Sequence, residues 1–166
     1  MPFLLRTIKK RRWDKETWLN EGKAQANALG DLQAKENRLS FWHVHDNKSN
    51  LDQVVAAIAA GRDVPEKFDY AIFDQNLLKK NNIGIEETAG DSFHKEADEH
   101  WHRDTGNLSA ENVAEIANII MKDGMKERIY ASDVVRLVKK EVKSGAIDVS
   151  PLKERLKQKG HDSWLE

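Results

Sequence analysis

The chain has 166 residues, no cysteine and a formal net charge of −1 at pH 7. The missing cysteine excludes disulfides, thiolate metal sites and cysteine nucleophiles, and the balanced charge gives no general argument for a polyanionic partner. The composition, 39% hydrophobic and 33% charged, is that of a heavily charged globular protein, without the run of about 20 apolar residues that a membrane span needs. The apolar start is also too short for a signal peptide, so we expect a cytoplasmic protein with no membrane partner.

The N-terminal half, residues 1–90, predicts a mixture of strands and helices. Residues 3–8 are apolar enough for a strand that is buried on at least one side. Residues 28–33 and 39–45 look like the two strands of a hairpin, because the stretch between them is polar and Asn37 suits a left-handed turn position.

The same half also predicts two helices and two further strands. Asp14 is a suitable N-cap for a short helix, and residues 51–58 carry an apolar helical stripe that should end at Gly61. Residues 70–73 form a short apolar run, and residues 83–85 suggest another strand after a turn-prone Asn-Asn pair.

The C-terminal half, residues 91–166, predicts helices only. Apolar residues recur at helical spacing after each of three serines, and glycines stand where the later helices should stop. The expected caps are Ser109, Ser132 and Ser150, and the expected stops are Gly145 and Gly160. We therefore expect an α+β fold in which a small, mainly antiparallel sheet in the N-terminal half packs with helices. Residues 1–166 should form a single domain whose halves share one core.

His43 and His45 form the first candidate site. They lie two apart on the predicted strand 39–45, so both side chains should share one face, about 7 Å apart along the strand. Such a pair binds a metal ion if a third ligand arrives from elsewhere, and Asp46 or a distant carboxylate could supply it. The alternative is a strand end where apolar positions give way to polar ones as the chain leaves the core.

A second group of histidines lies in residues 93–102. As a helix, this segment places His94 and His102 on one polar stripe, but about 12 Å apart along the axis, too far for one ion. His100 falls on the apolar stripe and should be a packed or an interface residue. We expect a solvated amphipathic helix whose acids, Asp98 among them, point to water.

A basic run followed by tryptophan is the third candidate, and it consists of Lys9, Lys10, Arg11, Arg12 and Trp13. Cations that neutralise phosphates beside an aromatic ring that stacks on bases are typical of nucleic-acid contacts. A solvated loop at a strand end has the same composition, and no nucleic-acid-binding motif accompanies the run.

Common enzyme signatures are missing from the sequence. There is no dinucleotide-binding glycine motif, no phosphate-binding loop and no nucleophile elbow, so we expect no cofactor. The sequence favours an accessory or interaction protein whose partner is another protein. The alternatives are a metal-dependent hydrolase using His43 and His45, and a nucleic-acid-binding module using residues 9–13. Catalytic activity and oligomeric state stay open.

Overall fold

The computed structural model describes residues 1–13, 25–62 and 66–161. The short helix expected after Asp14 lies outside these residues. Six strands form one antiparallel sheet in the order β4-β5-β2-β1-β3-β6, which confirms the α+β class. Their bounds are β1 Phe3–Ile8, β2 Leu39–Val44, β3 Phe68–Asp74, β4 Glu86–Glu87, β5 His102–Thr105 and β6 Met125–Ile129.

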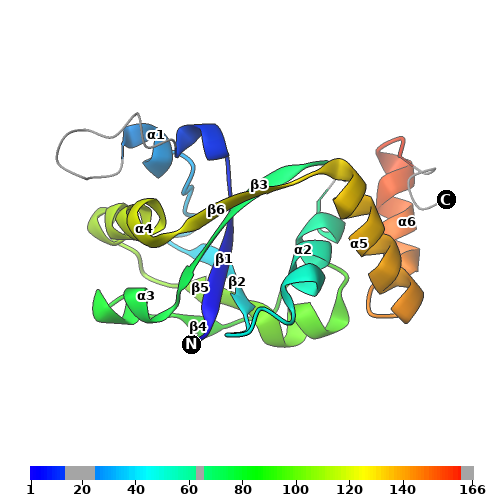
Figure 1. The fold of residues 1–166 in the computed structure, drawn as a ribbon, viewed down its shortest axis with the longest axis horizontal. Helices are drawn as coiled ribbons and strands as arrows, with labels where there is room; N and C mark the ends of the chain where they lie inside the picture. The colour runs from blue at the N-terminus through cyan, green and yellow to red at the C-terminus, as the bar shows by residue number, and fades with distance from the viewer. Residues whose placement is uncertain (14–24, 63–65, 162–166) are drawn as a thin grey trace.

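Helices cover both faces of the sheet (Figure 1). One face carries α1 Ala26–Leu29, α3 Asn76–Lys80 and α4 Ala110–Asp123. The other face carries α2 Leu51–Ala60, α5 Ala131–Ser144, α6 Val149–Gln158 and the π-helical turn η3 Ala97–Trp101. A short 3₁₀ turn, η1 Lys10–Arg12, follows β1. None of the helices in the described part of the chain is long and apolar enough to cross a lipid bilayer.

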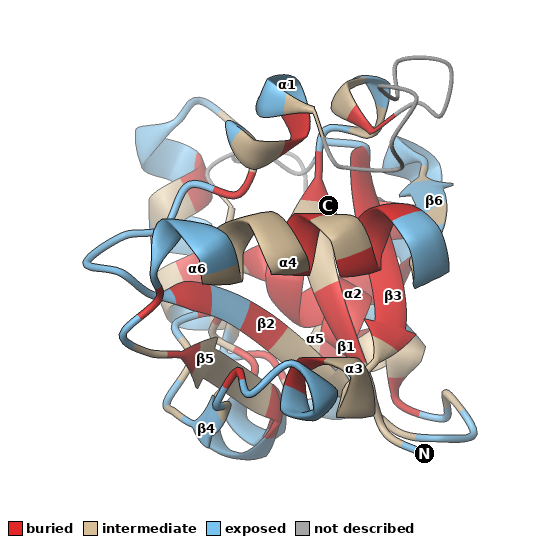
Figure 2. Ribbon diagram, turned by 90° about the vertical axis from the view of Figure 1, so that its left-hand side faces the viewer, coloured by how far each residue is buried: buried red, intermediate tan, exposed pale blue. Residues whose placement is uncertain are grey.

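The two faces bury separate apolar clusters because side chains alternate along each strand. On β1, Leu4 packs toward α4 and Leu5 toward α2; on β3, Phe73 and Ile72 divide in the same way. The central strands are therefore buried on both sides, as Figure 2 shows for β3. This double burial explains the consecutive apolar residues 3–5 of β1 and 70–73 of β3.

The C-terminal half is largely helical, but the expectation of helices only is corrected by β5 and β6, which this half contributes to the sheet. β6 is an edge strand with mostly exposed side chains, so its sequence carries charges in place of an apolar run. Arg128 on β6 forms an ion pair with Asp69 at 2.7 Å, and Glu127 accepts from the Tyr70 hydroxyl at 2.9 Å. Both halves thus meet in one sheet, while the division into domains stays a prediction.

The expected hairpin of residues 28–33 with residues 39–45 is wrong. The helix α1 Ala26–Leu29 occupies this segment, and the backbone N–H of Leu32 donates back to the carbonyl of Ala28 at 3.3 Å, as in a helical turn. β2 pairs with β1 and β5 instead. The left-handed position of Asn37 is confirmed by its φ of 58°.

The predicted starts and ends of the other helices and strands agree in part with the structure. The cap at Ser109 is confirmed, and so is the left-handed stop at Gly145, with a φ of 78°. α5 and α6 begin slightly before Ser132 and Ser150, and Asp148 caps the latter helix. The strand expected at residues 83–85 lies instead at β4, and the backbone N–H of Ile83 donates to the carbonyl of Leu78 at the end of α3.

Candidate functional site

The sheet opens between its two central strands. β1 and β2 pair only over residues 3–5 of β1, whereas β1 pairs with β3 over all of its residues. β2, on its other edge, pairs with β5 from Leu39 to Trp42. The facing edges of residues 6–8 and residues 39–41 therefore have no ladder between them. We call this opening the β1–β2 fork.

Arg6 occupies the fork. Its Nη1 donates to the carbonyl of Ser40 at 2.7 Å, and its guanidinium lies 5.8 Å from the centre of the Phe41 ring. Its Nε is buried and has no hydrogen-bond partner among the described residues. Burial lowers the pKa of Arg6, although the charges of Asp31 and Asp104 oppose the shift. A buried cation with an unused donor is costly, and an anionic ligand would relieve that cost.

Arg62 approaches the same opening from the end of α2. Its guanidinium lies 4.4 Å from the centre of the Phe68 ring, and burial lowers its pKa against the opposing charge of Glu66. Arg155 on α6 donates to the carbonyl of Gly61, the residue before Arg62, at 2.8 Å. This hydrogen bond connects the end of α2 to α6. Two arginines whose charge is penalised by burial thus lie at one place in the fold.

Two pockets adjoin at the fork, and Arg6, Thr7 and Arg62 line both. The first, which we call the Trp42 pocket, has a volume of about 300 Å³. Its other principal lining residues are Trp42, Ala57, Ile58, Asp91, Ser92 and His102. The second, the Lys9 pocket, has a volume of about 350 Å³, and its further lining includes Lys9, Gly30, Asp31 and Gln33.

His102 is held in one tautomer at the Trp42 pocket. The Thr88 hydroxyl donates to Asp104 at 3.1 Å, so its oxygen is left to accept from Nδ1 of His102 at 2.8 Å. Nε2 is then the unprotonated nitrogen and a hydrogen-bond acceptor. Burial lowers the pKa of His102 against the charges of Asp104 and Asp98, which keeps the ring neutral at physiological pH.

The basic run 9–13 is brought to the edge of this site. The backbone N–H of Lys9 and the indole N–H of Trp13 both donate to Oδ2 of Asp31, at 2.6 and 2.7 Å. Trp13 is only 1% exposed, so its ring is not presented for stacking on a base. Lys9 lines a pocket, while Arg11 is exposed to solvent. A nucleic-acid contact by these cations stays a prediction.

His43 and His45 lie together at the end of β2, with ring centres 5.7 Å apart. Nδ1 of His45 shares a hydrogen bond of 3.0 Å with the Ser49 hydroxyl, and Nδ1 of His43 is buried without a partner in the described chain. Burial and then the charge of Arg103 lower the pKa of His43. No group of three His, Cys, Asp or Glu side chains within residues 1–13, 25–62 and 66–161 is placed to hold a metal ion. The metal site thus stays a prediction without a third ligand.

The expected solvated helix over residues 93–102 is wrong at His94. His94 is fully buried, while His100 is exposed, so its position at an interface stays a prediction. The physical reason is that the segment forms a π-helical turn and ends at Trp101, after which His102 begins β5. A wider turn and an early exit into the sheet change which side chains share a face.

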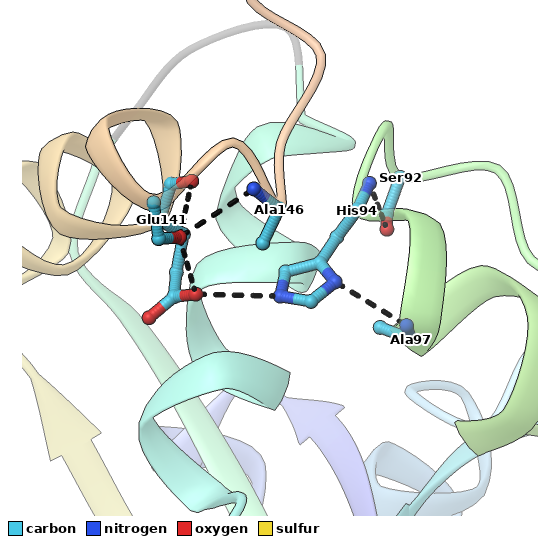
Figure 3. A network of polar contacts seen from close by, with 6 residues as sticks. Ser92, His94, Ala97, Glu141 and Ala146 are labelled. Carbon is cyan, nitrogen blue, oxygen red and sulfur yellow. Dashed lines mark hydrogen bonds and ion pairs between the residues drawn. The ribbon is translucent and has the colours of Figure 1, made fainter.

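His94 belongs to a buried polar cluster, and Figure 3 shows its contacts with Ser92, Ala97 and Glu141. Its Nδ1 accepts from the backbone N–H of Ala97 at 3.3 Å, so Nε2 carries the proton and faces Oε2 of Glu141 at 3.7 Å. Asp98 accepts both the backbone N–H of Ser92, at 2.9 Å, and the Ser92 hydroxyl. Asp98 is therefore not simply a solvated acid. We call Ser92, His94, Asp98 and Glu141 the closed cluster.

Sequence reasoning missed the fork because the motifs it searched for are local. The one available signal was Arg6 itself, a cation inside an otherwise apolar strand. Such a residue is rarely buried without a reason. The convergence of Arg62 and His102 on it depends on strand order and had no local signal.

A scan of protein-family models, a search of curated proteins and a search of solved structures each find no match to this chain. The residues of the fork therefore define what it can bind. Those residues provide buried guanidinium donors, a neutral histidine acceptor and a partly apolar wall.

Proposed function

We propose that this is an accessory protein that works by binding, and that its ligand is a small anion held at the β1–β2 fork. The observation that carries the proposal is the buried Nε of Arg6, which has no partner in the described chain. An N–H donor on a cation at such a position favours a carboxylate or phosphate oxygen above any neutral group.

The surroundings of Arg6 support the same conclusion. Burial outweighs the nearby carboxylates in setting the pKa of Arg6, and the same holds for Arg62. The cations are thus incompletely compensated within the chain, and an anion between them would offset the desolvation. A protein partner and a cytoplasmic location remain part of this proposal, the latter consistent with a chain that lacks cysteine.

The test is a titration of the ¹⁵N-labelled full chain with inorganic phosphate, followed through the Nε–Hε signals of its arginines. We expect the Arg6 signal, assigned by its loss in Arg6→Lys, to shift in a saturable way. Arg62→Gln should weaken this binding roughly tenfold, since one charge-assisted contact is lost.

Arg128 provides an internal control. Its Nε already donates to Asp69 at 2.7 Å, so phosphate should leave its signal nearly unchanged. Equal, non-saturating shifts at Arg6 and Arg128 would mean general screening of charge and would overturn the proposal.

A further inference from the structure

The Lys9 pocket has the chemistry of a phosphate site. Arg6, Arg62 and Lys9 border it, and Asp31 is the one acid among its lining residues. Oδ2 of that acid already accepts two N–H donors, from Lys9 and Trp13. A phosphate monoester carries a charge of about −1.5 to −2 near neutral pH, which suits two guanidiniums better than the single charge of a carboxylate does.

The Trp42 pocket has the chemistry of a site for a planar ring that bears an amine. Trp42, Ala57 and Ile58 supply its apolar wall, and aromatic rings stack on indole side chains. Asp91 and His102 line the polar side. A carboxylate and an unprotonated imidazole nitrogen are both acceptors, so the ring edge that faces them should carry N–H donors.

Arg6, Thr7 and Arg62 line both pockets, so a molecule that occupies both would lie across these three residues. It must join a phosphate to a planar, amine-bearing ring through a short polar linker. We infer that the ligand at the fork is a purine nucleoside monophosphate with an exocyclic amine. Its phosphate lies in the Lys9 pocket and its base in the Trp42 pocket. This inference rests on the proposed function and names the ligand class for the same site.

The experiment is calorimetric titration of the full chain with three probes: adenosine monophosphate, inosine monophosphate and inorganic phosphate. The adenine nucleotide should bind at least about tenfold more tightly than phosphate, because the base adds stacking. The inosine nucleotide has a carbonyl where adenine has the amine. It should bind several-fold more weakly than the adenine nucleotide, since acceptors would face an acceptor.

Two variants test the base end separately. Trp42→Leu should reduce adenine nucleotide affinity roughly tenfold and leave the phosphate response of Arg6 unchanged. Tyr130→Leu removes an aromatic side chain that is 62% exposed away from the fork, and should change neither. Asp91→Asn, at an exposed position, should remove the preference for the adenine over the inosine nucleotide.

The outcomes separate the inference from the proposed function. If phosphate shifts the Arg6 signal but the adenine nucleotide binds no more tightly, the nucleotide is overturned and the anion site stands. If neither probe moves that signal, both fail. Equal affinity for the two nucleotides would overturn the amine-bearing ring, even if Trp42→Leu did not fold.

Discussion

The closed cluster and the β1–β2 fork each leave one buried N–H without a hydrogen bond in the described chain, Nε2 of His94 and Nε of Arg6, and they differ in what lies beside that group. In the closed cluster, Asp98 accepts from Ser92, and His94 lies between Ala97 and Glu141. At the fork, Arg6 keeps a buried donor unused and faces two pockets. Burial of a charge does not by itself mark a binding site, whereas a buried donor without a partner beside an open volume does.

A substitution in the apolar core should lower the free energy of unfolding more than one at either polar site. Ile116 on α4 is fully buried, so Ile116→Ala should lower the free energy of unfolding by about 2–4 kcal/mol through lost contacts and a cavity. Urea denaturation measures this change. A loss below about 0.5 kcal/mol would show that the face of α4 is not part of the core.

A substitution in the closed cluster should give the second-largest loss of stability. Asp98→Ala removes the acceptor of the Ser92 N–H and hydroxyl, and hydrogen bonds to a charged group contribute about 1.5–3 kcal/mol. We expect a loss of that order in urea denaturation. Glu99→Ala is the matched control, since this neighbouring acid is exposed and should change stability by less than about 0.5 kcal/mol. Similar losses for both variants would contradict a structural role that is specific to Asp98.

A substitution at the fork should change stability little and abolish binding of the anion. Arg6→Met removes a desolvated cation together with one hydrogen bond to Ser40, so the free energy of unfolding should change by less than about 1 kcal/mol. Phosphate binding should be lost in the same variant. If Arg6→Met destabilised the protein as much as Asp98→Ala, the fork would be a structural cluster as well. The distinction between a stabilising cluster and a binding site would then be wrong.

The smallest expected effect is a dependence of stability on pH. Burial lowers the pKa of His102 at the fork and of His43 on β2, so below about pH 6.5 the unfolded chain binds more protons at these positions than the folded one. The free energy of unfolding should therefore fall as the pH drops from 7 toward 5. The double variant His43→Gln, His102→Gln should show a shallower fall in urea denaturation series, and an unchanged slope would assign the dependence to other groups.

Several elements could be predicted because their signals are local. Apolar spacing around Ile116 identifies α4, the Ser109 cap marks its start, and Gly145 marks the end of α5 by its left-handed backbone. The strands β1 and β3 follow from short apolar runs. These features depend on residues within one or two turns of each other, and a sequence displays them directly.

The hairpin and the histidine helix failed for a related reason. Residues 28–33 have no strand partner in the fold, and β2 finds its neighbours in β1 and β5, both distant in sequence. His94 is buried because α5 brings Glu141 against it. Pairing and burial of this kind depend on contacts between segments that are far apart, which local periodicity does not record.

By itself, the sequence determined the α+β class, the absence of cysteine chemistry and the helices that carry an apolar stripe, because composition and periodicity are properties of the chain alone. Only the tertiary structure decided that β1 and β2 separate after residue 5 and that Arg6, Arg62 and His102 meet there. The physical reason is that a binding site consists of donors, acceptors and volume from different elements. Their coincidence exists only once strand order and helix packing have placed them together.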